Sequence, residues 1–151
     1  DIIDVFTTSP DEGEVDIYFL MAGGEIPSEE LIADVKEALN DEKIRPLTDK
    51  VNVYAPYVTG YNLKLTYYIN AEDESIAKDI DTAVRDAVDE YVLWQKSKIG
   101  RDINPSKLTA MIIGAGAKRV EITTPVYTEI DSNRIAVALE TEIISGGVED
   151  D

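Results

Sequence analysis

Carboxylates are the most abundant side chains in this sequence that could act as acids or bases. The chain contains 31 Asp and Glu residues but no His and no Cys. It therefore lacks the commonest general base, the usual transition-metal ligands and any thiol nucleophile. A hydrolase built from these residues would need two carboxylates that face each other across a cleft.

The close carboxylate pairs have a spacing that is typical of solvated helix faces. Asp79 with Asp81 and Asp89 with Glu90 lie on the polar side of a predicted helix. No calcium-binding loop motif is present: residues 11–14 fit a hairpin turn, and residues 72–74 fit a helix start, where negative charge is stabilising. We therefore predict no catalytic, no metal-binding and no cofactor-binding residue, and no cofactor.

The one glycine-rich segment that resembles a phosphate loop runs in the wrong direction. Gly114-Ala115-Gly116 precedes a predicted strand, whereas a phosphate-binding loop opens a helix. We interpret it as a chain reversal, with Gly114 as the left-handed cap of the preceding helix.

Charge is large and unevenly distributed. With 14 Lys and Arg, the chain has a formal charge of −17, which argues against general binding to nucleic acid or to anionic membranes. No apolar run is long enough to span a membrane. Six basic residues lie between positions 96 and 119, where Asp102 is the only acid. Because complementary charge orients partners, we predict a protein interface that includes Lys96, Lys98 and Arg101.

Alternating apolar residues predict the strands that must position these groups. The pattern has period two over residues 14–21 and 61–69, with one apolar and one wet face in each. On residues 61–69 the apolar set is Tyr61, Leu63, Leu65, Tyr67 and Ile69. Shorter strands are predicted at residues 51–55 and 120–122. Residues 136–144 are predicted to form a last strand, although the run from Ala136 to Glu140 also fits a helix.

Helical spacing of apolar residues predicts three helices. The first begins near Ser28 with acids in its first turn, and the second is a long helix over residues 75–97. The third has Asn104 as N-cap and Pro105 at its first position. This order predicts an α+β fold of two small α/β sandwich modules, residues 1–56 and 57–151, with helices on one face of mostly antiparallel sheets.

Three ordered segments resemble the baseplate J-like family of contractile phage tails. The first is Lys43 to Pro56, which contains Arg45, Pro46, Leu47, Thr48 and Asp49 followed by alternating valines. The others are Ile99 to Leu108 and Gly116 to Pro125. The resemblance extends over about residues 14–144, and the glycine-rich N-terminal region of that family is missing.

The resemblance implies a structural protein of the baseplate wedge, represented here by its C-terminal portion. It implies a phage, a prophage or a related contractile injection system as the source, and a place in the virion tail baseplate after assembly in the host cytoplasm. The implied partners are other baseplate wedge and tail proteins in a multi-subunit assembly. It implies no enzymatic activity. The Arg45–Asp49 segment is interpreted as a structural turn.

Two other functions stay open at this stage. The acid count and the exposed aromatics are compatible with a hydrolase, carbohydrate-active or Mg²⁺-dependent, that uses carboxylates alone. The acidic surface is also compatible with a module that binds a cationic peptide.

Overall fold

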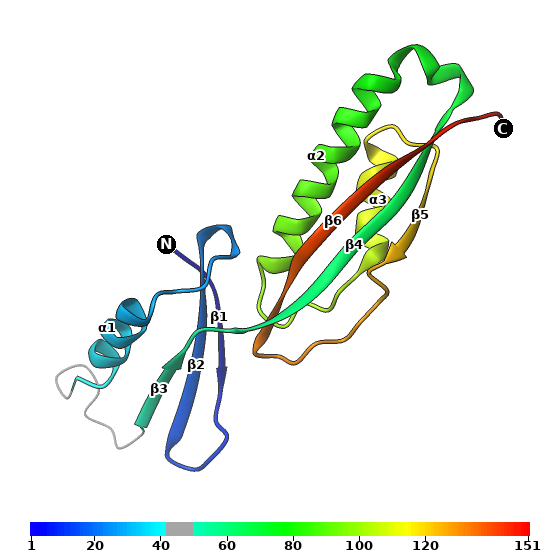
Figure 1. The fold of residues 1–151 in the computed structure, drawn as a ribbon. Coiled ribbons are helices and arrows are strands. Elements are labelled where there is room, and N and C mark those ends of the chain that lie inside the picture. The colour runs from blue at the N-terminus through cyan, green and yellow to red at the C-terminus, as the bar shows by residue number, and fades with distance from the viewer. Residues whose placement is uncertain (42–49) are drawn as a thin grey trace.

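The computed structural model describes residues 1–41 and 50–151, which form two mixed three-stranded sheets and three α-helices (Figure 1). The predicted α+β class is confirmed. The predicted turn of Arg45, Pro46, Leu47, Thr48 and Asp49 lies outside the described residues.

The first sheet has the order β1-β2-β3, with β1 at Ile2–Thr8, β2 at Glu14–Met21 and β3 at Lys50–Tyr54. The sequence reasoning missed β1, whose alternation is broken by Ile2 and Ile3 in succession. A hairpin turn joins β1 to β2, as predicted, and Gly13 has a φ of 80° there. A short 3-10 turn, η1 at Ala22–Gly24, follows β2.

Helix α1, Glu29–Leu39, covers one face of this first sheet. It begins where predicted, because the Leu31 N–H donates to Ser28 Oγ at 3.1 Å. At its other end the Asn40 side chain makes two hydrogen bonds to the main chain of Val51 in β3. These bonds tie the C-terminal end of α1 to β3.

The second sheet has the order β5-β4-β6, with β4 at Tyr57–Asn70, β5 at Arg119–Thr124 and β6 at Arg134–Glu149. The predicted alternation of β4 is confirmed, because its apolar set is buried and the side chains between are exposed or half-buried. The last strand is longer than the predicted 136–144.

Two helices cover the apolar face of this second sheet (Figure 1). A 3-10 turn, η2 at Ala71–Ile76, leads into α2 at Ala77–Lys96, and α3 spans Pro105–Gly114. The predicted cap of α3 is confirmed by the bond from the Ser106 N–H to Asn104 Oδ1 at 3.1 Å. The predicted left-handed cap at Gly114 is wrong, since the positive φ of 115° belongs to Gly116.

The prediction of mostly antiparallel sheets needs a correction. The β1–β2 and β4–β5 pairs are antiparallel, but the β2–β3 and β4–β6 pairs are parallel. A parallel pair requires a crossover between its strands, which α1 supplies for the first sheet. The spacing of apolar residues within each element does not reveal this choice.

The face of β2 that alternation predicts to be wet is buried at its C-terminal end. Phe19 faces the α1 side, while Tyr18 and Leu20, on the opposite face, are only 7% and 0% exposed. The first sheet packs with this second face against the loop after α2 and the start of β6. We call this contact the junction.

Candidate interaction surface at the junction

The centre of the junction is apolar. Tyr18 and Leu20 form one buried cluster with Ile99 and Ile135, against which two half-buried residues, Phe6 and Val137, also pack. The cluster joins residues that are more than 70 positions apart in sequence. Apolar area that leaves water here couples the two sheets.

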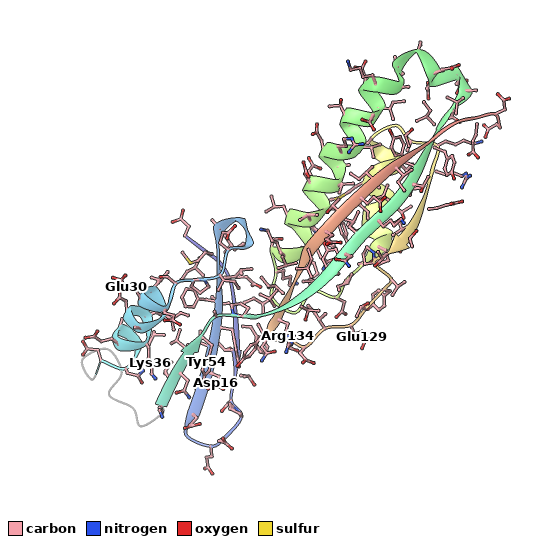
Figure 2. All side chains as sticks on the ribbon, in the orientation of Figure 1. Asp16, Glu30, Lys36, Tyr54, Glu129 and Arg134 are labelled. Carbon is pink, nitrogen blue, oxygen red and sulfur yellow. The ribbon has the colours of Figure 1, made fainter. Side chains whose placement is uncertain are left out.

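Aromatic rings continue this contact toward the start of β4. The Tyr18 ring centroid lies 6.0 Å from that of Phe6, 5.2 Å from that of Tyr54 and 6.4 Å from that of Tyr57. The Arg134 guanidinium stands 5.5 Å from the Tyr57 ring centroid and donates to the Val58 carbonyl at 3.2 Å. Figure 2 shows Tyr54 on the first sheet and Arg134 at the beginning of β6.

One hydrogen bond and one close steric contact fix the register of the junction. The Ile99 N–H donates to Asp4 Oδ2 at 2.7 Å, across 95 positions of sequence. Gly24 packs directly against the end of α2: a Cβ at Gly24 would lie 2.7 Å from Lys96 Cγ and 2.8 Å from the Lys96 carbonyl oxygen. Gly24 also has a φ of 70°, which residues other than glycine rarely adopt. The position therefore requires glycine both for its backbone conformation and for the lack of space.

Each residue of the predicted basic interface has a different environment in the structure. Lys96 Nζ lies 3.7 Å from Glu25 Oε1, so it forms an ion pair within the chain. Arg101 donates to the Trp94 carbonyl and to Ser97 Oγ, and its guanidinium lies 4.1 Å from the Trp94 ring centroid.

Burial lowers the pKa of the Arg101 guanidinium, and the nearby Asp4 carboxylate partly offsets this effect. Lys98 is exposed and forms no ion pair with any residue in the described ranges. Of the three, Lys98 is the one exposed residue, whereas Lys96 and Arg101 are half-buried.

The remaining basic residues of the 96–119 segment do not form one patch. Lys107 Nζ lies 5.5 Å from the Trp94 ring centroid, so it belongs with Arg101 near the junction. Lys118, just before β5, and Arg119, its first residue, pair with Asp151 and Glu149 near the C-terminal end of β6. Proximity in sequence thus overstated the size of the basic patch.

Gln95 is the residue that the sequence reasoning missed. It is fully buried at the end of α2, where it accepts from the Tyr91 hydroxyl at 2.9 Å and from the Asn104 N–H at 3.1 Å. Its amide donates to the carbonyls of Arg101 and Asp102. Gln95 therefore holds the loop that carries the junction contacts. The available signal was its position four residues after Tyr91, on the core-facing stripe.

Two carboxyls of the described residues, Glu149 and Asp81, have a clearly shifted pKa, and both are lowered. No group of three or more potential metal-ligating residues is found within the described ranges. A shallow depression at the end of β6 is lined by Glu72, Glu149, Asp150 and Asp151. However, Arg119 binds both oxygens of Glu149, at 2.7 and 2.8 Å, and holds the pKa of that carboxyl below its ordinary value. A general acid requires the opposite shift.

The second carboxyl with a clear shift also lies in a fixed ion-pair network. Asp81 accepts from the Tyr67 hydroxyl and from Arg85 Nε, and both bonds lower the pKa of Asp81.

Among the helices of the described residues, none combines the length and the apolar character that a membrane span requires.

The comparisons with known proteins agree with the motifs. Residues 1–55 match the model of the baseplate J-like central domain, and residues 61–144 match that of the baseplate J-like protein C-terminal domain. Baseplate protein J of Escherichia phage P2 is 30% identical over 148 residues, an alignment that covers 97% of this chain and 48% of that protein. The chain thus spans about half the length of this curated relative. On the strength of both family models and of this relative, the chain belongs to the baseplate J-like family.

Proposed function

We propose that this chain is a structural component of a contractile-tail baseplate, in a phage or prophage, and that it joins other baseplate wedge and tail proteins through its surface. The observation that carries this proposal is the match of both family models together with the similarity to a baseplate protein. The ion pairs of Glu149 and Asp81, which lower the pKa of both carboxyls, support a structural role for these two acids rather than acid–base chemistry.

The fixed junction supports the same role. A buried apolar cluster, the Asp4–Ile99 hydrogen bond and the close approach of Gly24 to Lys96 hold the two sheets in one relative orientation. A protein that positions its neighbours benefits from such rigidity, because binding then costs less ordering of the chain. We also propose that residues 1–56 and 57–151 form two modules, because each range contains one of the two separate sheets.

We further propose that Lys98 leads the basic interface, with Lys96 and Arg101 in supporting positions. Lys98 is exposed, whereas Lys96 and Arg101 also form contacts within the chain. The partner surface would be acidic. Such a contact changes the association rate and its salt dependence more than the final affinity.

The first experiment tests assembly itself. The full-length protein is expressed together with the baseplate proteins encoded beside it and is then purified. We expect a stable complex whose members include those neighbours. Purification of the protein alone, across low and moderate salt, would overturn the proposed function.

The second experiment tests Lys98. Lys98→Glu is compared with Lys78→Glu, since Lys78 is also exposed but lies at the far end of α2. We expect the first variant to slow association about tenfold at low salt and the second to leave it almost unchanged. Equal rates for both variants would refute the role of Lys98 and leave the assembly result in place.

A further inference from the structure

The outer strand of the first sheet presents a strip of aliphatic side chains to solvent. Ile2, Ile3 and Val5 of β1 are 52%, 44% and 51% exposed, so three of four successive positions carry an exposed branched side chain. Edge strands that face water normally carry polar or charged residues, because apolar ones invite association. We call these three residues the edge strip.

The edge strip belongs to the face of the sheet on which α1 packs. Val5 pairs with Phe19 and Ile2 pairs with Met21, and both partners on β2 belong to the apolar cluster under α1. Directly paired residues point to the same face of a sheet. The other face of β1 contacts the junction through Asp4. Ile2 and Val5 therefore face away from the junction.

Helix α1 is too narrow to cover β1 as well as β2 and β3. Neighbouring strands are about 4.8 Å apart and a helix is about 10 Å wide, so one helix covers about two strands. The cluster under α1 joins this helix to β2 and β3, and within the described ranges it includes no residue of β1. The second sheet, which also has three strands, is covered by two helices. The layer over the first sheet thus has an open place above β1.

The helix next to this open place is itself only partly covered. The apolar stripe of α1 is formed by Leu31, Ile32, Val35 and Leu39, and all four are half-buried. No residue of α1 is fully buried, whereas α2 and α3 each contain buried residues. A layer that is one element short accounts for both the exposed edge strip and the half-buried stripe.

Sequence that precedes β1 in the full-length protein is well placed to fill this position. Residues 1–55 match a central domain and residues 61–144 match a C-terminal domain, and a central domain has further sequence before it. The phage P2 relative is covered to only 48% by this chain. Such preceding sequence enters the fold at Ile2, beside the edge strip, so its effective concentration there is high.

A second copy of this chain is a less favourable occupant. Two copies with a formal charge of −17 each repel one another. Strand pairing between two β1 edges is also disfavoured, because β1 has a register shift between Ile2 and Asp4. An apolar segment of the same polypeptide meets neither obstacle.

We propose that an amphipathic helix from the region before β1 packs on the edge strip, beside α1, as the second helix of this layer. Its apolar face contacts Ile2, Ile3 and Val5. The inference concerns contacts within one polypeptide, so it goes beyond the proposed assembly role. Its failure would leave the co-purification result unaffected.

Thiol protection in the full-length protein tests whether the edge strip is covered. These 151 residues contain no Cys, so Val5→Cys carries a single thiol once any cysteine of the preceding region is replaced by serine. Val148→Cys is the matched control, because Val148 is 42% exposed on β6. We expect the thiol at position 5 to react with a maleimide at least about tenfold more slowly than the control, and equally fast in urea. Equal rates in the folded protein would overturn the proposal.

Photo-crosslinking identifies what covers the edge strip. Val5 is replaced by photoreactive benzoylphenylalanine in the full-length protein, which is irradiated at high dilution, and the crosslinked peptides are mapped by mass spectrometry. We expect crosslinks to the region before β1, within single molecules. Crosslinks between two molecules would assign the strip to a second copy. Crosslinks confined to residues 1–151 would show that this chain covers its own strip, and either result would overturn the proposal.

A charge placed in the contact should release the segment. In the full-length protein we expect Val5→Asp to speed proteolytic cleavage ahead of β1 about tenfold, because the helix then spends more time undocked. Val148→Asp makes the same change on β6 and should leave that cleavage rate unaltered. The same rate for both variants would contradict packing on the edge strip.

Discussion

The hydroxyl of Tyr61 offers the sharpest test of the packing described above. Tyr61 is 7% exposed and faces the core from β4, yet its hydroxyl has no hydrogen-bond partner among the described residues. Burial and the neighbouring Tyr91 raise the pKa of Tyr61, so the hydroxyl is neutral at ordinary pH. We therefore predict that Tyr61→Phe increases the stability of the chain.

The expected magnitude follows from the cost of leaving a buried donor unpaired. That cost is about 1–3 kcal/mol, and the small void left by the missing oxygen offsets part of the gain. We expect a net increase of about 1 kcal/mol in the free energy of unfolding, or about 2–4 °C in Tm for a chain of this length.

Tyr91 provides the matched control. It is fully buried in the same core, with its ring 6.5 Å from that of Tyr61, but its hydroxyl donates to Gln95 Oε1 at 2.9 Å. Burial raises the pKa of Tyr91 to about 12. Tyr91→Phe should therefore lower the free energy of unfolding by about 1 kcal/mol.

The assay is urea unfolding at neutral pH, followed by fluorescence. Trp94 is the one tryptophan of the chain, and its ring lies 5.9 Å from that of Tyr91, so the signal reports on this core. The two variants should move the midpoint in opposite directions. If Tyr61→Phe destabilises the chain as much as Tyr91→Phe does, the Tyr61 hydroxyl has a partner and the reasoning is refuted.

Three further predictions concern the junction and the second sheet. Gly24→Ala should cost at least about 2 kcal/mol in urea unfolding, more than Gly23→Ala, because both have positive φ but only Gly24 meets the main chain at the end of α2; equal losses would argue against the close contact. Gln95→Leu should cost about 2–4 kcal/mol, since three main-chain groups of the loop after α2 lose their partner; a neutral result would contradict the assigned network. The lowered pKa of Glu149 stabilises the folded chain above its ordinary value of 4.5, and this contribution is lost as pH falls through the lower folded-state pKa. Arg119→Gln should therefore flatten the loss of stability between about pH 5 and pH 2, measured by urea unfolding at each pH.

Several elements could be predicted from the sequence because their signals are local. The alternation of β4 needs only one apolar and one polar face, and the starts of α1 and α3 need only Ser28 and Asn104 beside the first turn. Residues 1–55 and 61–144 also carry enough of the family pattern for both family models to match. These properties depend on neighbours within a few positions or on residue identity alone.

The tertiary structure decided which of the remaining surfaces are buried. Tyr18 and Leu20 lie on the face of β2 that local alternation assigns to solvent, and they are buried because the second sheet packs on that face. Lys96, Lys98 and Arg101 were predicted to share a basic interface, and in the structure Lys96 pairs with Glu25 and Arg101 stacks on Trp94, while Lys98 is exposed. The burial of Tyr18 and Leu20 and the pairing of Lys96 with Glu25 depend on residues far away in sequence. The period of apolar residues and the secondary-structure propensity describe one element at a time. Burial and strand pairing depend on elements from distant parts of the chain that pack against it.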